Sequence, residues 1–251
     1  MSWLARLRSR KRRPLRALQV EVTSRCTRRC AICPRAALAQ RWREGDLTEA
    51  HFAALARDLA LVEHVHLQGW GEPLLHRSLP DWAKKAKTAG CQVSVTTNGD
   101  LLAGAADWLL AGDVDQVAVS LAGDAETHAA LCDGSHVDSL LASAGALATR
   151  AREQGLSLRV KASYLLTRRN AASLPLVVEL AAEVGLTELF VIHLDCQPSW
   201  FLAEQAAFTS TGLRSEVALV LDEAEQAARR GGIRYRGPVL SSQFLLSCAL
   251  D

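Results

Sequence analysis

Short apolar runs alternate with amphipathic segments along most of the chain, and this alternation predicts its elements. The runs are too short for helices, whereas the segments between them repeat apolar side chains every three or four positions, as one helix face does. The predicted strands are Ala17–Val22, Val65–Gln68, Gln92–Thr96, Gln116–Leu121, Ser157–Leu166 and Glu188–Leu194. The predicted helices are Thr48–Leu61, Leu79–Ala89, Ala103–Ala111, Val137–Gln154, Leu174–Val184 and Thr211–Arg230. Beyond Asp195 the pattern weakens, and it predicts no element after residue 230.

The order of these elements predicts a parallel sheet. Six strand-then-helix units in a row require right-handed crossovers, which bring the strands together in parallel. Such a sheet either closes part of a barrel or lies open as a doubly wound sheet. Both architectures place functional loops at the carboxyl ends of the strands. The sequence therefore predicts an α/β fold whose functional residues follow the strands.

Length and composition limit the class of protein. A chain of 251 residues can bury one sizeable core, and its 49% hydrophobic and 22% charged residues are too apolar for a disordered chain. No uncharged apolar run approaches the roughly 18 residues of a membrane span, and no short apolar segment behind a basic head indicates a secretory signal. We expect one large domain, or one domain with appendages, without a membrane span.

The charge is unevenly distributed along the chain. Residues 1–16 hold seven of the 29 Lys and Arg residues and no acid, which leaves 22 basic against 27 acidic side chains in the remainder. A mildly acidic body does not favour a nucleic-acid-binding surface. We interpret residues 1–16 as a flexible, solvated basic arm, and docking of this arm to an acidic partner, RNA or lipid headgroups is the alternative.

The strongest chemical signal is a group of three cysteines directly after the first predicted strand. Cys26, Cys30 and Cys33 have a C-x3-C-x2-C spacing, which is not the spread pairing of a disulfide framework. Three thiolates in one tight loop can converge on an iron–sulfur cluster, where three ligands leave one of four irons open. A closed zinc site would need a fourth ligand, which no nearby His or Cys supplies. The other alternative is that the three cysteines have only a structural role. Metal-bound or reactive thiols favour a reducing, cytoplasmic setting for the protein.

With this loop the sequence resembles the radical S-adenosylmethionine (SAM) superfamily over roughly residues 17–195. The C-x3-C-x2-C spacing after the first strand is that family's hallmark, and the following Pro34-Arg35 is common in one large branch. The resemblance implies a partial (β/α)6 TIM-like barrel in which the three cysteines hold a [4Fe–4S] cluster, with SAM chelated to the open iron. One electron then cleaves SAM to methionine and a 5′-deoxyadenosyl radical, which takes a hydrogen atom from the substrate.

A glycine-rich motif after the second strand resembles a SAM-binding segment of the family. Gly69, Gly71 and Glu72 lie in Gln68–Pro73, which is similar to the family's Gly-Gly-Glu-Pro motif with Trp70 inserted. Glycines let the backbone approach a ligand closely, and the Glu72 carboxylate is an acceptor for the amino group of SAM. A plain strand-to-helix turn with a capping Glu72 is the alternative.

Two further positions match the family after the third and fourth strands. Asn98 lies in Thr96–Gly99, similar to a Thr-Asn-Gly turn that faces the cofactor, and a tight turn alone is the alternative. Ser120 lies in a segment similar to Ser-Leu-Asp-Gly, which implies that its hydroxyl meets the ribose or carboxylate of SAM. Here Ala122 replaces the usual Asp, and Cys132 stands where related sequences often carry Arg. An anion contact from that Arg is therefore not carried over.

Polar residues also mark the fifth and sixth strands. Lys161 shares one face of its strand with Arg159 and Ser163, so a cation pointing into a barrel would bind a carboxylate of SAM or of the substrate. A solvated edge strand is the alternative. His193 and Asp195 end the sixth strand, where substrate groups would lie, and a structural histidine is the alternative. His193, like the cysteine loop and the other motifs, falls at a strand carboxyl end, as an active site on that face requires.

The resemblance divides the chain into three parts. Residues 1–16 form the arm, 17–200 the radical SAM partial barrel, and 201–251 a mainly helical C-terminal extension. The tail Ser247–Asp251 resembles the start of the auxiliary-cluster (SPASM-type) extension of peptide-modifying radical SAM enzymes. The cysteines outside the loop have no cluster spacing, so no second cluster is predicted and we interpret them as small buried residues or free thiols. They are Cys91, Cys132, Cys196 and Cys248.

The sequence is thus identified as a member of the branch that acts on peptides, on proteins or on clients in cofactor maturation. This branch implies a reducing partner of the flavodoxin or ferredoxin type. Two other classes stay open from the residues alone. One is a non-catalytic iron–sulfur or zinc module that docks a partner, and the other is a doubly wound enzyme with a single catalytic cysteine.

Overall fold

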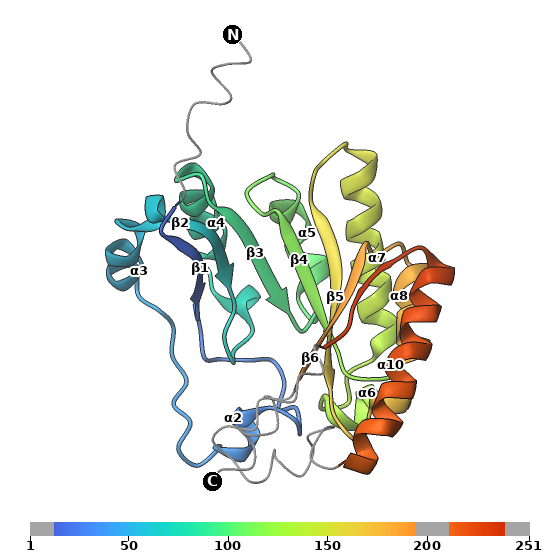
Figure 1. The fold of residues 1–251 in the computed structure, drawn as a ribbon. Coiled ribbons are helices and arrows are strands. Elements are labelled where there is room, and N and C mark those ends of the chain that lie inside the picture. The colour runs from blue at the N-terminus through green and yellow to red at the C-terminus, as the bar shows by residue number, and fades with distance from the viewer. Residues whose placement is uncertain (1–12, 194–210, 239–251) are drawn as a thin grey trace.

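The computed structural model describes residues 13–193 and 211–238, and within them seven strands form one parallel sheet (Figure 1). The strands lie side by side in the order in which they occur along the chain, and each pairs in parallel with the next. They are β1 (Leu15–Val20), β2 (Val62–Leu67), β3 (Gln92–Thr97), β4 (Gln116–Leu121), β5 (Arg159–Leu166), β6 (Glu188–His193) and β7 (Arg234–Arg236).

Helices fill the connections between the strands. The longer ones are α3 (Glu49–Ala56), α4 (Leu79–Thr88), α5 (Leu102–Leu109), α7 (Val137–Glu153), α8 (Leu174–Glu183) and α10 (Thr211–Gly231). The short ones are α2 (Pro34–Ala37), α6 (Ala125–Leu131) and the 3-10 helices η1 (Leu59–Leu61), η2 (Pro73–Leu75) and η3 (Ala171–Ser173). Among the described residues, no helix combines the length and the apolar character that a membrane crossing requires.

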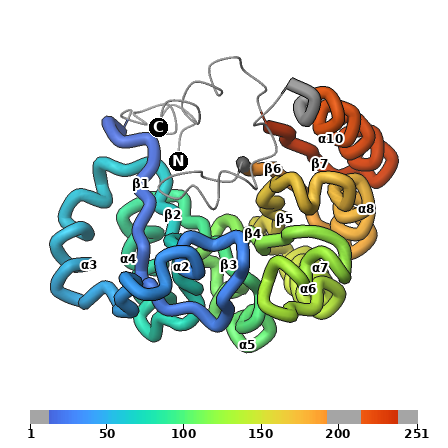
Figure 2. Tube along the Cα trace, turned by 90° about the horizontal axis from the view of Figure 1, so that it is seen from below, coloured from blue at the N-terminus to red at the C-terminus, as the bar shows by residue number. Residues whose placement is uncertain are grey.

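The consecutive strand order decides between the two predicted architectures. A doubly wound sheet reverses its strand order at a switch point and carries helices on both faces, whereas this order never reverses. Figure 2 shows the sheet curving into an open arc with α4, α5, α7, α8 and α10 on its outer side. The predicted α/β partial barrel is therefore confirmed, with a seventh strand added to the expected six.

The two faces of the sheet differ in polarity. Positions that face the helices are apolar and buried, for example Val65, Val93 and Val117, and they pack with helix side chains in one core. The alternating positions on the inner face of the central strands include many polar side chains. His64 of β2 and Ser94 of β3 lie on that face, where His64 Nε2 is 2.7 Å from Ser94 Oγ. A sheet covered by helices on both faces would be apolar on both, so the polar inner face marks a surface that receives a ligand or solvent.

Capping residues and glycines set the helix ends as the sequence predicts. The Thr48 side chain accepts the His51 N–H at 3.3 Å and begins α3. Gly90 ends α4 with a φ of +82°, in the left-handed region that favours glycine. The predicted helix over residues 48–61 is divided, because α3 ends at Ala56 and η1 follows.

The remaining differences concern short elements and boundaries. The helices α2 and α6 and the strand β7 are too short to show a hydrophobic period, and the pattern did not predict them. β1 begins at Leu15, inside the predicted arm, and β7 joins the sheet from within the predicted extension. Asp195, Cys196, Cys248 and the tail Ser247–Asp251 lie outside the described residues, as does most of the arm.

Replacement of Trp82 by alanine tests the packing of α4. Trp82 is fully buried, stacks on Phe52 with ring centroids 4.3 Å apart, and donates from Nε1 to Glu49 Oε2 at 2.7 Å. We expect Trp82→Ala to lower the free energy of unfolding by about 3–5 kcal/mol, measured by urea denaturation. Trp70→Ala, at a residue that is 43% exposed, is the control and changes it by about 0.5 kcal/mol or less. Equal effects of the two substitutions would contradict this packing.

Candidate active site

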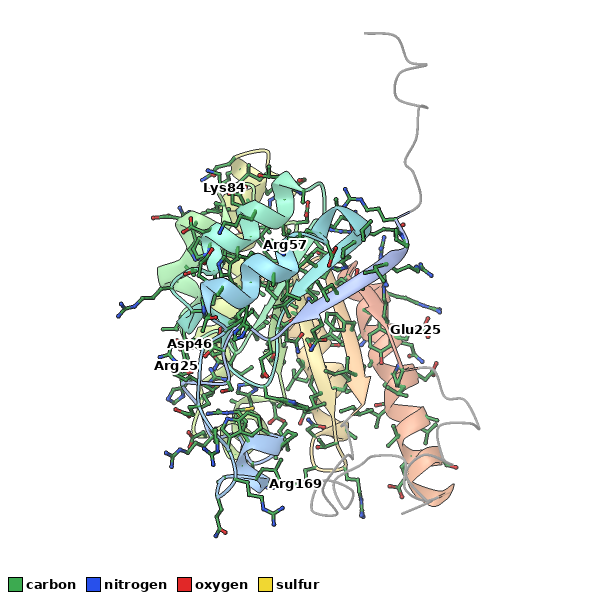
Figure 3. All side chains as sticks on the ribbon, turned by 90° about the vertical axis from the view of Figure 1, so that its left-hand side faces the viewer. Arg25, Asp46, Arg57, Lys84, Arg169 and Glu225 are labelled. Carbon is green, nitrogen blue, oxygen red and sulfur yellow. The ribbon has the colours of Figure 1, made fainter. Side chains whose placement is uncertain are left out.

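The cysteine loop follows β1 and is fastened at its start. Arg25 binds the Asp46 carboxylate through Nε at 2.9 Å and Nη2 at 2.8 Å, and Figure 3 shows the two side chains together. Thr23 Oγ1 donates to the same carboxylate at 2.6 Å, and Trp42 Nε1 donates to the Ser24 carbonyl at 3.1 Å. Arg25 and Asp46 are each about 40% exposed, so solvent screens their ion pair and it adds little to the stability of the fold. Its effect is to position the start of the loop.

A second anchor ties the loop to the end of β3. The Arg28 side chain is only 7% exposed and forms an ion pair with Asp100, whose two carboxylate oxygens are each 3.0 Å from Arg28 Nε. Thr27 Oγ1 also donates to Asp100, at 2.6 Å. Burial alone would raise the pKa of Asp100, but the hydrogen bonds from Arg28 and Thr27 lower it below its usual value. Asp100 is therefore an ionised partner for the buried guanidinium.

Asn98 connects this anchor to the first cysteine. Its Nδ2 donates to Thr27 Oγ1 at 2.9 Å and to Cys26 Sγ at 3.5 Å, and its backbone N–H donates to Glu72 Oε2 at 2.7 Å. The side chain that the sequence assigns to SAM thus holds the cysteine loop. A contact between Asn98 and SAM stays a prediction.

One cavity of about 310 Å³ joins the cysteine loop to the predicted SAM segments. Cys26, Cys30 and Cys33 are half-buried free thiols, and all three line the cavity. The other predicted residues that line it are Gly69, Gly71, Glu72, Asn98 and Ser120. Residues from loops that are far apart in the sequence therefore meet at the carboxyl ends of the strands.

The three thiols suit an iron–sulfur cube better than a single metal ion. Within the described ranges, no three His, Cys, Asp or Glu side chains are grouped closely enough to hold one ion. A zinc ion draws all its ligands around one atom, whereas a [4Fe–4S] cube takes each thiolate on a different iron. Burial raises the pKa of Cys26 and of Cys33, so both are neutral thiols until a metal centre displaces their protons. The donor set fits a cluster held by three cysteines.

Glu72 is buried, and its carboxylate accepts three hydrogen bonds from the protein. Its Oε1 accepts the Leu74 N–H at 3.0 Å and the Thr97 hydroxyl at 2.8 Å, while its Oε2 accepts the Asn98 N–H. Burial raises the pKa of Glu72, and these donors counteract part of that shift. The carboxylate therefore caps η2 and fixes the turn after β3, as the alternative interpretation of the motif expected. A bond to the amino group of SAM stays a prediction.

Replacement of Glu72 by glutamine tests this bridging role. The amide nitrogen of Gln would face at least one of the three donors, and a buried donor without an acceptor costs about 1–3 kcal/mol. We expect Glu72→Gln to lower the free energy of unfolding by that amount, measured by urea denaturation. Glu63→Gln, at an exposed position of β2, is the control. An unchanged Glu72→Gln protein would show that the three hydrogen bonds do not hold the two loops together.

The two glycines of the motif make close approaches to the chain itself. A Cβ on Gly71 would lie 2.1 Å from the Thr23 carbonyl oxygen and 2.6 Å from that of Arg25, both in the backbone of the cysteine loop. A Cβ on Gly69 would instead meet the Glu21 side chain at 2.2 Å. Gly71 is therefore needed for packing of the two loops, beyond any approach to a ligand.

Ser120 and Lys161 have different positions relative to the cavity. Ser120 lines it, and Ser163, directly opposite on β5, does as well. Lys161 is not among the lining residues. Its Nζ lies 3.3 Å from Glu188 Oε2 in a buried ion pair, and Arg236 Nε also binds Glu188, at 3.1 Å. The structure thus gives Lys161 a carboxylate from the protein and does not bring it to the site.

The end of β6 is only partly described. The backbone of His193 pairs with that of Leu166, which places it at the carboxyl end of the sheet. The His193 side chain lies outside the described residues. Its neighbour Ile192 lines the cavity.

The sequence missed one thiol of the site. Cys132 is buried, lines the same cavity, and lies in a buried cluster against which Cys30 packs. This contact, and then burial, raise the pKa of Cys30. Cys132 is 99 positions beyond Cys33, so no cluster spacing connects it with the loop. The one signal in the sequence was that a cysteine stands where related sequences often carry Arg.

Fold and site together define a class: a parallel partial barrel whose first strand is followed by three grouped cysteines and whose cavity opens at the strand carboxyl ends. Comparison with protein families agrees with this class. The profile described as the Radical SAM superfamily matches residues 20–154, more than half of the chain. The chain belongs to the radical SAM superfamily, which uses a [4Fe–4S] cluster and SAM.

Curated relatives extend the likeness over most of the chain. A probable GTP 3′,8-cyclase of Metallosphaera sedula is 33% identical over 192 residues, covering 72% of this chain and 56% of the relative. A PqqA peptide cyclase of Xanthomonas euvesicatoria is 29% identical over 227 residues, covering 88% of this chain and 58% of the relative. The chain therefore spans a little over half the length of these relatives.

Solved structures support the fold. Streptococcus suis SuiB bound to S-adenosylmethionine has a TM-score of 0.70 at 15% identity, covering 94% of this chain and 53% of that one. SuiB bound to the precursor peptide SuiA has a TM-score of 0.71 at 16% identity, covering 93% of this chain and 51% of that one. At these identities the likeness shows the shared fold alone.

Proposed function

We propose that this chain is the catalytic barrel of a radical SAM enzyme that modifies a peptide. The observation that carries the proposal is the convergence of three half-buried thiols from one loop on the cavity that the glycine-rich motif and the β3 turn also line. Cys26, Cys30 and Cys33 hold the [4Fe–4S] cluster in this proposal. When bound, the cluster and SAM supply a carbon-centred radical that removes a hydrogen atom from the substrate.

The residues of the chain position these groups and exclude water. The Arg28–Asp100 pair and the Asn98 amide hold the cysteine loop at one orientation. Within the described residues, Glu72 Oε2 accepts one hydrogen bond, from the Asn98 N–H, so we assign the contact with the amino group of SAM to this oxygen together with the backbone carbonyls of residues 69–71 at the cavity wall. The Ser120 hydroxyl supplies a further hydrogen bond to SAM. Apolar side chains of the same cavity keep water from the reactive centre, namely Ile32, Leu165 and Ile192.

Two features support a peptide as the substrate. The cavity at the carboxyl ends of the strands carries polar side chains, among them Gln68, Asn98 and Ser120, which suit hydrogen bonding to a peptide backbone. Among the relatives, the PqqA peptide cyclase and SuiB with its precursor peptide are named for peptides. The relative with 33% identity is named a GTP 3′,8-cyclase, so a purine nucleotide is the second candidate.

The thiols and the required electron favour a reducing cytoplasm and a donor of the flavodoxin or ferredoxin type.

Anaerobic reconstitution tests the reaction class. The protein is loaded with iron and sulfide, reduced with dithionite and incubated with SAM, and the products are measured by liquid chromatography and mass spectrometry. We expect a brown protein with about four irons per chain that releases methionine and 5′-deoxyadenosine. One zinc per chain without a chromophore would instead indicate a non-catalytic module and would overturn the proposal.

Deuterium transfer tests the substrate class. The reconstituted protein is incubated with SAM and either a deuterated peptide, encoded by the short reading frame nearest the gene, or deuterated GTP. We expect deuterium in 5′-deoxyadenosine from the peptide alone. Deuterium from GTP alone would overturn the peptide assignment while leaving the reaction class intact.

A further inference from the structure

A fourth thiol lies against the cysteine loop. Cys132 is 6% exposed, lines the cavity with the three loop cysteines, and lies in a buried cluster against which Cys30 packs. Part of its surroundings is apolar, because Ile32, Ala122 and Leu131 form a small buried cluster with it. Water is therefore largely excluded from this contact.

Two hydrogen bonds on either side set Cys30 opposite Cys132. The Arg29 N–H donates to Asp133 Oδ2 at 3.0 Å, and the Ala31 N–H donates to the Leu131 carbonyl at 2.9 Å. The two segments therefore run in opposite directions, with position 29 beside 133 and position 31 beside 131. Cys30 and Cys132 lie between these two contacts, and Cys30 packs against the cluster that contains Cys132. Neither hydrogen bond uses a thiol, so both persist when Cys30 binds iron.

The backbone of Cys132 is itself held in place. Its N–H donates to the His128 carbonyl at 2.8 Å as the cap of α6, and the following Asp133 has a φ of +57°. His128 is fully buried, and its Nδ1 accepts the Ala122 N–H at 3.1 Å. A rigid turn thus presents the Cys132 thiol to Cys30, independent of the cavity's contents.

We propose that Cys132 is a positioning residue that donates an S–H···S hydrogen bond to the Cys30 sulfur when that sulfur binds the cluster, and that this bond raises the reduction potential of the cluster. The inference rests on the proposed function, because it takes Cys30 as a cluster ligand. A hydrogen bond to a coordinating sulfur stabilises the reduced cluster, which carries one more negative charge than the oxidised one. We assign Cys132 as a donor and not as a fourth ligand, because the three loop cysteines would already complete a ligand set that leaves one iron open.

A pair of variants separates the hydrogen bond from the volume of the side chain. Cys132→Ser keeps a donor at the same place, whereas Cys132→Ala removes it. The reduction potential of the reconstituted full chain is measured by anaerobic titration with electron paramagnetic resonance, without SAM or substrate. We expect a lower potential in Cys132→Ala and a potential close to that of the original protein in Cys132→Ser. Cys91→Ala, which removes a buried thiol elsewhere, is the control and should leave the potential unchanged.

Iron content and folding are measured in the same samples. Equal reduction potentials in the original protein and in Cys132→Ala would overturn the proposed hydrogen bond. A fall of the iron content of Cys132→Ala to the level of Cys30→Ala would also overturn it, because such a loss would identify Cys132 as a ligand of the cluster. Cys132→Val, which also lacks a donor, replaces Cys132→Ala if circular dichroism shows that the latter is unfolded. If the original protein itself takes up no cluster, the proposed function fails. If the protein takes up the cluster but Cys132→Ala does not change its reduction potential, only the role of Cys132 fails.

Discussion

Replacement of any one of Cys26, Cys30 or Cys33 by alanine is expected to abolish both cluster loading and SAM cleavage. In the proposed cluster each thiolate would supply the only protein ligand to one iron, so its loss would expose that iron to solvent and to dissociation. Changes to residues that only support a metal ligand typically cost 10–100-fold in affinity or activity. We therefore expect a loss of more than about 100-fold in 5′-deoxyadenosine formation by each variant. Iron analysis and product chromatography on anaerobically reconstituted protein measure the two effects.

The control for these variants is a cysteine outside the loop. Cys91 is 3% exposed, and its Sγ donates to the Leu59 carbonyl at 3.2 Å on the far side of the sheet from the cavity-lining residues. Cys91→Ala removes the same atoms and should keep both the iron and the cleavage of SAM. If just one of the loop cysteines proves essential, a doubly wound enzyme with a catalytic thiol gains support and the cluster assignment fails.

The architecture could be predicted from the sequence because it depends on a repeated pattern. The strand-then-helix alternation fixes parallel pairing, and every strand predicted over residues 17–194 overlaps a strand of the sheet. Whether the sheet closes or opens depends on strand order, which hydrophobic periodicity does not encode. The family resemblance supplied that choice. β7 could not be predicted, because Arg234–Arg236 places one partly buried Tyr between two exposed arginines, and its pairing with β6 is what makes it a strand.

The site was predictable where its parts are local and was missed where they are distant. The three cysteines that we assign to the cluster lie within eight residues, so one loop brings them together. The environment of Lys161 depends on Glu188, 27 positions later, and that pairing removes the lysine from the cavity. Cys132 meets Cys30 through a register set by Arg29 and Ala31, and no spacing in the sequence reveals it. Side-chain partners on separate elements are thus the information that a single sequence lacks.

Replacement of Gly71 by alanine is expected to disrupt the site more than the same change at Gly69. The added Cβ on Gly71 would lie within 2.6 Å of two backbone oxygens of the cysteine loop, while the adjacent Glu72 N–H donates to one of them, that of Arg25, at 2.7 Å. Backbone atoms held by hydrogen bonds cannot turn away as a side chain can, so either the cysteine loop or the glycine-rich motif must shift. Overpacking of this kind costs about 1–3 kcal/mol in stability.

Gly69→Ala is the matched test of this reasoning, because its Cβ meets the flexible side chain of Glu21. Glu21 Oε1 accepts the Trp70 N–H at 2.6 Å, so the substitution breaks at most that one hydrogen bond when the side chain moves. We expect Gly71→Ala to lower iron loading and the SAM-dependent change in the electron paramagnetic resonance spectrum, and Gly69→Ala to retain most of both. If Gly69→Ala is the more damaging variant, close approach to the ligand rather than packing of the two loops explains the glycines of this motif.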